Sequence, residues 1–248
     1  MNYSDVACII PSRIKSTRLP NKALANIGGK SMIEHVISQL HNRAINNIYV
    51  ATDSQQIAQK VSRTGAIAVM TSKHCLTGSD RVYEAFQAIP NNNKIKYIIN
   101  IQGDMPFINY RVLQNIINKL RNTSFDIVTP VVKVNRDIAN TNSNVKVVAS
   151  IHGKALYFSR SLIPYGAKNF LYHVGIYGYR TPALKKFVTL NMTQYETIEK
   201  LEQLRALEHG MNIGIVMSNE IPISVDTYQD LEKARKYYIK SKEHNNCL

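Results

Sequence analysis

The 248-residue chain has only three cysteines, Cys8, Cys75 and Cys247, and they lie far apart. This spacing fits neither a disulfide framework nor a zinc site, because both need cysteines in pairs or clusters. We interpret Cys8, which lies within an apolar run, as a core residue. Unpaired cysteines are typical of reducing compartments, so we expect a cytoplasmic protein.

Long apolar runs are also missing. Hydrophobic residues make up 44% of the chain, yet no run approaches the roughly 18 apolar residues of a membrane span. The polar residues 1–5 lead directly into an apolar segment, so we expect neither a signal peptide nor membrane insertion. The sequence contains no repeat, low-complexity segment or flexible linker. We therefore predict a single domain over residues 1–248.

Acidic residues are few: 17 Asp and Glu stand against 31 Lys and Arg, which gives a net charge of +14. Such a charge is compatible with nucleic-acid binding, and equally with a solvated basic surface. Aromatic residues do not alternate with the cations as a stacking platform for single strands requires. We expect no nucleic-acid partner.

Apolar runs alternate with amphipathic segments over the first half of the chain. Strands are predicted at residues 6–11, 48–52, 67–70 and 97–101, and helices at residues 33–40, 54–64, 81–89 and 109–121. Strands that are apolar on both faces predict an α/β fold with a mostly parallel, Rossmann-like sheet, covered by helices on both faces.

The pattern changes after about residue 126. Short strands with few helices between them predict a small antiparallel extension over about 126–180. The stretch "YETIEKLEQLRALEHG" then predicts one continuous helix that stops at Gly210. Thr227 is expected to cap the last helix.

Polar clusters follow three of the predicted parallel strands. They are the basic loop from Arg13 to Lys22, the pair Thr52-Asp53, and Gln102-Gly103-Asp104. In open parallel sheets, ligands bind beyond the carboxyl ends of the strands. We therefore expect all three clusters at one edge of the sheet.

The basic loop lacks both the G-x-x-x-x-G-K-S/T and the G-x-G-x-x-G phosphate-binding patterns. It must therefore bind an anion mainly with side chains, and it offers Arg13, Lys15, Arg18 and Lys22. Arginine forks and lysine point charges both suit phosphate oxygens. The loop thus favours a triphosphate ligand, and a solvated basic loop is the alternative.

Two aspartates are candidate ligands of a metal ion. Asp104 follows a buried strand and a glycine, and Asp226 also ends an extended stretch. Mg²⁺ favours one or two carboxylates together with phosphate oxygens and water. Taken singly, each aspartate is equally compatible with a helix cap. Next to a basic loop on the same sheet edge, the metal interpretation is favoured.

Eight motifs occur in order along the chain: "IIPSRIKSTRLPNKAL", "VATDS", "TGSDRVYEA", "NIQGDMP", "ALYFSRSLIP", "HVGIYGYR", "LEQLRALEHG" and "VDTYQDLEKAR". In this order they resemble the 3-deoxy-manno-octulosonate cytidylyltransferase (CMP-Kdo synthetase) family, from about residue 6 to residue 236. The first motif is shared with CMP-sialic acid synthetases and other sugar nucleotidyltransferases. The fifth, sixth and seventh together are more specific.

The resemblance implies an Mg²⁺-dependent reaction in which CTP and the 2-hydroxyl of the eight-carbon sugar acid Kdo give CMP-Kdo and pyrophosphate for lipopolysaccharide synthesis. It implies a homodimer as well. A CMP-sialic acid synthetase is the near alternative, and a basic nucleic-acid-binding protein without turnover the remote one.

Site residues follow from the same resemblance, position by position. Those that would act on the triphosphate and the reacting groups are Arg13, Arg18, Lys22, Gln102 and Asp104. The nucleotide pocket would also contain Ser12, Ser79 and Arg81, and the metal ligands would be Asp104 and Asp226. The sugar-acid pocket would be lined by Arg160, His173, Tyr177, Glu202 and Gln203.

Three features depart from the family pattern. Met105 stands where the family commonly has Glu, which removes a charge beside the expected metal site. The stretch "IPISVDT" lacks the usual glycine-containing turn before Asp226. The segment between Pro164 and Phe170 is shorter than the family's usual loop. None of these departures changes the basic loop or Asp104.

Overall fold

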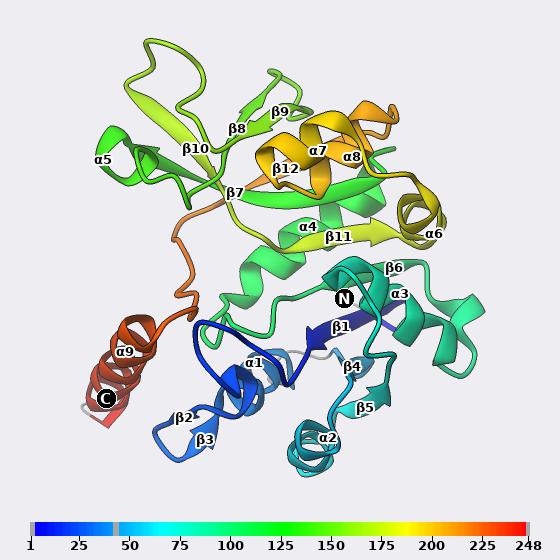
Figure 1. The fold of residues 1–248 in the computed structure, drawn as a ribbon, viewed down its shortest axis with the longest axis vertical. Helices are drawn as coiled ribbons and strands as arrows, with labels where there is room; N and C mark the ends of the chain where they lie inside the picture. Colours follow the sequence, from blue (N-terminus) through cyan, green and yellow to red (C-terminus); the bar gives the residue numbers. More distant parts are fainter. Residues whose placement is uncertain (1–2, 42–44, 247–248) are drawn as a thin grey trace. The chain divides into compact units, whose positions relative to one another are not determined.

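The structure, a computed structural model, describes residues 3–41 and 45–246 (Figure 1). The chain divides into two compact units. The first unit comprises Met1–Ile95, Asn100–Tyr110 and Pro222–Leu248, and the second comprises Lys96–Ile99 and Arg111–Ile221. A single domain over residues 1–248 stays a prediction, and each unit is described by itself. Cys247 lies outside the described residues.

The first unit contains a parallel set of strands in the order β5-β4-β1. Their bounds are β1 (Val6–Ser12), β4 (Ile48–Thr52) and β5 (Ile67–Met70). β1 and β4 are almost wholly buried, as expected for strands covered on both faces. The register pairs Ser12 with Thr52 and Thr52 with Met70, so the carboxyl ends of the three strands are aligned.

The helices and short elements of the first unit are α1 (Met32–His41), α2 (Gln55–Val61), α3 (Gly78–Ala88), α9 (Tyr228–Asn246), the 3-10 turns η1 (Lys22–Leu24) and η2 (Asn92–Lys94), and the hairpin strands β2 (Asn26–Ile27) and β3 (Lys30–Ser31).

Local signals in the sequence explain how several of these helices begin and end. Before α1, the backbone N–H of Ser31 donates to Glu34 Oε2 at 2.8 Å and Ser31 Oγ donates to the same oxygen at 2.5 Å, so Glu34 caps the start of the helix. The chain after α2 turns at Gly65, whose φ of 84° is left-handed. Thr227 precedes α9 and its Oγ1 accepts from the backbone N–H of Asp230 at 3.2 Å, as predicted.

The second unit is built around the long strand β7 (Ile127–Asn135). β10 (Asn169–His173) and β11 (Tyr177–Arg180) pair with β7 antiparallel, whereas β12 (Ile213–Ser218) pairs with it parallel. β8 (Lys146–Ala149) continues the sheet antiparallel to β10, and β9 (Ala155–Ser159) is antiparallel to β8. The predicted antiparallel strands are therefore present. β12, which comes later in the chain, is the parallel neighbour of β7.

The helices assigned mainly to the second unit are α4 (Tyr110–Asn122), α5 (Arg136–Ala139), α6 (Thr181–Thr189), α7 (Gln194–Glu199) and α8 (Gln203–Glu208). The remaining strand is β6 (Tyr97–Asn100), whose last residue belongs to the first unit. The α/β fold class predicted from the sequence is confirmed.

The continuous helix predicted over "YETIEKLEQLRALEHG" is wrong. The chain forms α7 and α8 with a break at Lys200, which adopts a left-handed φ of 54°. The guanidinium of Arg160 donates to the carbonyl of Glu199 at 2.8 Å and to that of Lys200 at 3.4 Å. These bonds satisfy carbonyls that a continuous helix would have used itself.

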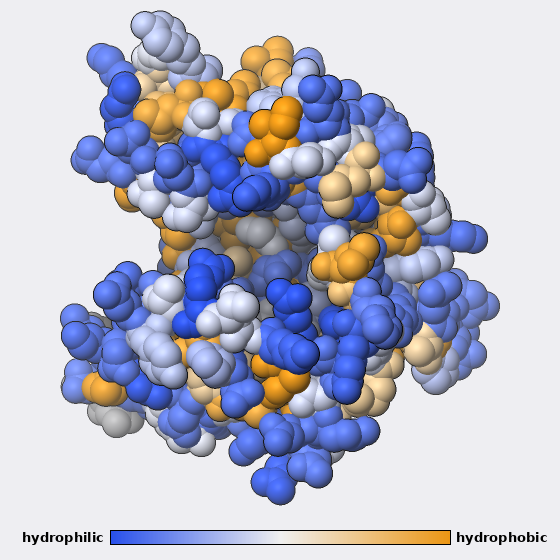
Figure 2. All heavy atoms as spheres, in the orientation of Figure 1, coloured by the Kyte–Doolittle hydropathy of each residue, from blue (hydrophilic) through white to orange (hydrophobic). Residues whose placement is uncertain are grey.

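The surface in the view of Figure 2 is mostly hydrophilic, with hydrophobic residues scattered over it. Within residues 3–41 and 45–246, no helix has the length and the apolar character needed to cross a membrane.

Candidate active site

A pocket of about 300 Å³ lies within the first unit. Its walls are the loop after β1, the segment that enters α3, the turn after β6, and Asp226 near the start of α9. The lining residues are Pro11, Ser12, Arg13, Lys15, Ser16, Thr17, Arg18, Lys22, Ala23, Cys75, Leu76, Thr77, Gly78, Arg81, Gln102, Gly103, Asp104 and Asp226. The pocket thus unites all but one of the residues predicted for the nucleotide and the metal. The exception is Ser79, which is buried in α3 beside the pocket wall.

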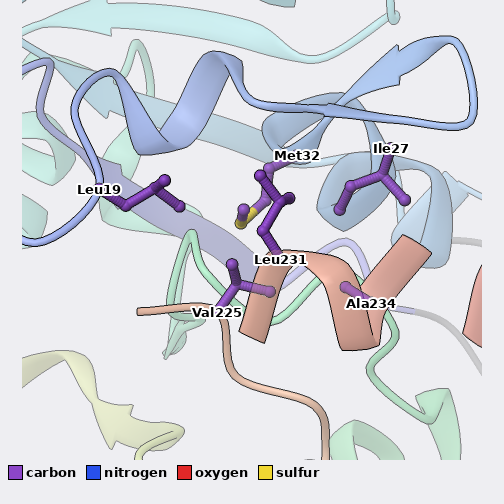
Figure 3. Packing of buried hydrophobic residues seen from close by; sticks show 6 residues of the cluster. All are labelled: Leu19, Ile27, Met32, Val225, Leu231 and Ala234. Carbon is purple, nitrogen blue, oxygen red and sulfur yellow. The ribbon is translucent and has the colours of Figure 1, made fainter. Parts of the chain in front are cut away.

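A small apolar cluster fixes the backbone beneath the charged side chains. Leu19, next to Arg18, and Val225, next to Asp226, are buried together with Met32, Leu231 and other residues of the first unit. Figure 3 shows the side chains of Leu19 and Val225 directed into this shared cluster. Burial of such aliphatic side chains contributes roughly 1.5–3 kcal/mol each. The cluster therefore ties together two chain segments that are about two hundred positions apart in the sequence.

Charged side chains on these segments form a continuous chain of ion pairs. Lys22 Nζ lies 2.6 Å from Asp104 Oδ2 and 3.0 Å from Asp226 Oδ1. Arg18 Nη2 lies 3.3 Å from the same Oδ1 of Asp226. The basic loop and both predicted metal ligands therefore meet at one point in the first unit.

The environment changes the protonation of this group. Burial opposes the charge on Lys22, but Asp104 and Asp226 together outweigh it and raise the pKa of the amine above its ordinary value. Burial raises the pKa of the Asp104 carboxyl, and Lys22 offsets only part of this effect. A neighbouring cation favours the ionised form of such a buried carboxyl.

Gly103 allows the turn that carries Asp104 to lie close to the end of β1. A Cβ at this position would be 3.1 Å from the carbonyl oxygen of Pro11, tighter than most side chains tolerate. The carbonyl of Asp104 accepts from the backbone N–H of Val225 at 2.9 Å, which joins the two aspartate segments. Met105, the uncharged replacement in this turn, is 8% exposed and packs as a core residue.

The tip of β4 contributes Asp53, which the sequence placed at the expected ligand-binding edge of the sheet without naming it among the site residues. Asp53 Oδ1 accepts from the backbone N–H of Ile14 at 3.2 Å, and Asp53 Oδ2 pairs with Arg81 Nη2 at 3.5 Å. Arg81 also donates to Thr71 Oγ1 at 2.6 Å. Asp53 therefore links the basic loop to the predicted nucleotide-pocket arginine. Its position directly after a strand, like that of Asp104, is the signal that placed it at this edge in the sequence analysis.

The pocket wall also contains a thiol. Cys75 Sγ donates to Glu84 Oε2 at 2.9 Å, and Ser72 donates its backbone N–H to Glu84 Oε1 at 2.7 Å. Burial, reinforced by Glu84, raises the pKa of Cys75 to about 11. The thiol is therefore protonated at neutral pH, which fits a structural role better than a nucleophilic one.

The residues predicted for the sugar acid lie in the second unit. The rings of His173 and Tyr177 are 5.4 Å apart between centroids. Burial lowers the pKa of His173 to about 3, so the imidazole is neutral at pH 7. Burial, and after it Tyr179 and Glu202, raise the pKa of Tyr177 well above its usual value. The pair therefore presents neutral groups.

Gln203 is 5% exposed, and its Nε2 has no hydrogen-bond partner within the described part of the chain. A buried amide without a partner costs free energy, which a ligand hydroxyl or carboxylate would recover.

Arg160 is engaged differently from the expectation. Its guanidinium donates to the carbonyls of Glu199, Lys200 and Asn142, the last at 3.3 Å. Its backbone N–H donates to Glu199 Oε2 at 2.9 Å. Three of the five guanidinium N–H groups are therefore used on the backbone, and they hold the break between α7 and α8. The role of Arg160 toward the sugar acid stays a prediction.

The donor set of the first unit suits a divalent cation bound together with phosphate. Within the described ranges, no group of three or more His, Cys, Asp or Glu side chains forms a closed metal cage. Two carboxylates, those of Asp104 and Asp226, lie beside a pocket wall with five cationic side chains. Mg²⁺ commonly takes one or two carboxylates and completes its shell with phosphate oxygens and water. The residues present therefore fit that ion.

The chain is similar to proteins of known function along nearly its whole length. A family model described as cytidylyltransferase matches residues 7–213. A 3-deoxy-manno-octulosonate cytidylyltransferase of Rickettsia bellii is 54% identical over 242 residues, which is 98% of this chain and 99% of that protein. A protein of the same name from Rickettsia felis is 53% identical over 238 residues, 96% of this chain and 97% of that protein. A solved structure of CMP:2-keto-3-deoxy-manno-octonic acid synthetase complexed with CTP is 34% identical, with a TM-score of 0.91 over 96% of this chain and 100% of that chain.

Proposed function

Because the chain belongs to the cytidylyltransferase family, we propose that it transfers CMP from CTP to 3-deoxy-D-manno-octulosonate (Kdo) and releases pyrophosphate. The observation that carries this proposal is the convergence of Arg18, Lys22, Asp104 and Asp226 in one pocket of the first unit. Cations and paired carboxylates at a sheet edge are what a metal-bound triphosphate requires.

The triphosphate is bound by the basic loop. Arg13 and Arg18 provide planar forks for phosphate oxygens, and Lys22 provides a compact charge. Each charge-assisted contact contributes roughly 1.5–3 kcal/mol. Ser12, Ser79, Arg81 and Gln102 complete the nucleotide side of the site.

Asp104 and Asp226 are the residues that hold the divalent cation, Mg²⁺ in this proposal. When bound, this ion supplies a Lewis acid that neutralises charge on the phosphate oxygens. The protein supplies the position of the ion through Gly103, Val225 and the apolar cluster beneath them.

The sugar acid is recognised mainly by neutral groups. Neutral His173 and the protonated hydroxyl of Tyr177 suit sugar hydroxyls, and so does the unpartnered amide nitrogen of Gln203. Glu202 accepts hydrogen bonds from sugar hydroxyls. Arg160 pairs with the sugar carboxylate through the N–H groups that the backbone does not use.

The reaction is a single in-line displacement. The 2-hydroxyl of the sugar acid attacks the α-phosphorus and releases its proton to solvent. The bond from the α-phosphorus to the oxygen that bridges the α- and β-phosphates breaks, and its electron pair leaves with pyrophosphate. The basic loop neutralises the charge that develops on the leaving group. The cysteine in the pocket is protonated, so the residues present favour direct transfer over a covalent enzyme intermediate.

We further propose that the protein acts as a cytoplasmic homodimer that activates Kdo for lipopolysaccharide assembly. The near relatives bear the name of that activity, which favours Kdo over the nine-carbon sialic acid. A basic protein that binds nucleic acid without turnover would leave the paired aspartates of the pocket without a role.

A matrix of substrates tests this function. Pyrophosphate release is measured with CTP, UTP, ATP and GTP, each with Kdo and with N-acetylneuraminate, in the presence of Mg²⁺. We expect release only with CTP and Kdo together, and its loss when the divalent cation is chelated. Pyrophosphate release with N-acetylneuraminate but not with Kdo, or release without any sugar acid, would refute the assignment.

Two variants assign the metal ligand. Asp104→Asn removes one carboxylate charge from the pocket and should lower turnover by roughly 100-fold or more. Asp137→Asn makes the same chemical change on the exposed helix α5 and serves as the matched control. Equal activity of the two variants would contradict the role given to Asp104.

A further inference from the structure

Lys22 occupies the position between the two carboxylates of the nucleotide pocket. Its Nζ lies 2.6 Å from Asp104 Oδ2 and 3.0 Å from Asp226 Oδ1, so one ammonium bridges both side chains. These oxygens are the ones that a divalent cation would take. The ammonium and a metal ion therefore compete for the same lone pairs.

The local charges balance without any added ion. Arg18 and Lys22 bring two positive charges, and Asp104 and Asp226 bring two negative ones. A divalent cation that entered this neutral group would be repelled by the ammonium between the carboxylates. Lys22 must therefore release at least one aspartate before the ion can bind.

A polyanion in the pocket would give Lys22 an alternative acceptor. Its side chain is a flexible four-carbon stem, and the pocket wall around it includes Arg13 and Lys15, which would draw phosphate oxygens to the same cavity. The backbone of Lys22 is fixed in η1, where its carbonyl accepts from the backbone N–H of Ala25 at 3.1 Å. Only the side chain needs to move.

We propose that Lys22 is a resident cation that holds Asp104 and Asp226 together and is exchanged for the divalent ion when the triphosphate enters. This inference rests on the proposed function and adds to it an order of binding for the nucleotide and the metal ion. The ion binds weakly to the free protein and tightly with the nucleotide, because the phosphates accept the displaced ammonium. Coupling of this kind is reciprocal, so the ion strengthens nucleotide binding by the same factor.

Mn²⁺ binding to the full chain tests the exchange without turnover. Free Mn²⁺ is measured by electron paramagnetic resonance, with and without CTP, in the absence of any sugar acid; a CTP blank corrects for Mn²⁺ bound by the nucleotide itself. For the wild type we expect binding that is at least about tenfold weaker without CTP. A charge-assisted hydrogen bond of about 1.5 kcal/mol corresponds to that factor.

Substitution of Lys22 should remove the need for CTP in Mn²⁺ binding. Lys22→Met should bind Mn²⁺ without CTP about tenfold more tightly than the wild type, because the competing ammonium is gone. Lys15→Met removes the same charge from the same pocket wall and is the matched control, because Lys15 makes no ion pair with either aspartate among those found within the described residues. It should retain the weak binding of the wild type. Lys22→Arg, which keeps the charge, should also remain weak.

The outcomes separate this inference from the proposed function. Equal Mn²⁺ affinity of the wild type and Lys22→Met without CTP would overturn the exchange. Mn²⁺ binding to the wild type that is as tight without CTP as with it would overturn it too. Lys22→Gln repeats the test if circular dichroism shows that the methionine variant is unfolded. Pyrophosphate release by the wild type with CTP and Kdo is measured separately, so a failed exchange would leave the proposed reaction standing.

Discussion

A shift from about pH 7.5 to about pH 5 should destabilise the folded chain through one buried histidine. His173 is 6% exposed, and burial lowers its pKa from 6.5 to about 3. Its Nε2 lies 2.9 Å from Thr129 Oγ1, and that hydroxyl lies 2.8 Å from the carbonyl oxygen of Ile176. We infer that the neutral imidazole donates from Nε2 to Thr129, which in turn donates to Ile176.

The sign and size of the effect follow from the two pKa values. Between pH 6.5 and about pH 3, the unfolded chain binds a proton at this histidine and the folded chain does not. The stabilising contribution is therefore fully present above pH 6.5 and is lost as the pH falls. From about pH 7.5 to about pH 5, this single group lowers the free energy of unfolding by about 2 kcal/mol.

Urea denaturation followed by circular dichroism measures this loss, and amide hydrogen exchange of the peptide that contains β10 locates it. His173→Gln is the control, because its amide nitrogen can still donate to Thr129 and it does not titrate. The variant should lose about 2 kcal/mol less than the wild type over the same pH interval. An identical loss in both proteins would refute the buried, neutral state of His173.

Three further predictions concern other groups in the structure. Glu196→Gln leaves Arg205, whose Nη2 lies 2.5 Å from Glu196 Oε1, without its buried counter-charge. The free energy of unfolding should fall by about 3–5 kcal/mol, and an unchanged urea midpoint would contradict this. Cys75, with a pKa of about 11, should react with iodoacetamide about tenfold faster per pH unit from pH 7 to pH 10, as followed by mass spectrometry; complete labelling within minutes at pH 7 would show a thiolate instead. Gly178→Ala places a Cβ 2.3 Å from Ile116 Cγ2 and should cost about 1–3 kcal/mol through overpacking; a melting temperature equal to that of the wild type would exclude that contact.

The layout of the first unit could be predicted because it depends on short-range patterns. Apolar runs gave the bounds of β4 and β5 directly. β4 is buried on both faces, which leaves no polar position to confuse the periodicity, whereas β5 is partly exposed and was predicted from its apolar run alone. Once three parallel strands were predicted, the common edge of their carboxyl ends followed from topology alone. The meeting of Arg18 with Asp226, across some two hundred positions, follows in turn from that edge and from the apolar cluster beneath it.

The sugar-acid side of the site was harder to predict, because its arrangement depends on hydrogen bonds between distant segments. The apolar positions of residues 195–209 fit one helix, and only the tertiary contacts of Arg160 show why the helix breaks at Lys200. An arginine that serves the backbone and an arginine that serves a ligand look alike in a sequence. The same ambiguity applies to Lys22, which a pattern assigns to phosphate and the fold places on two aspartates. Residue type therefore predicts which charges gather at this site, whereas the partner of each charge depends on which acceptors are present at the time.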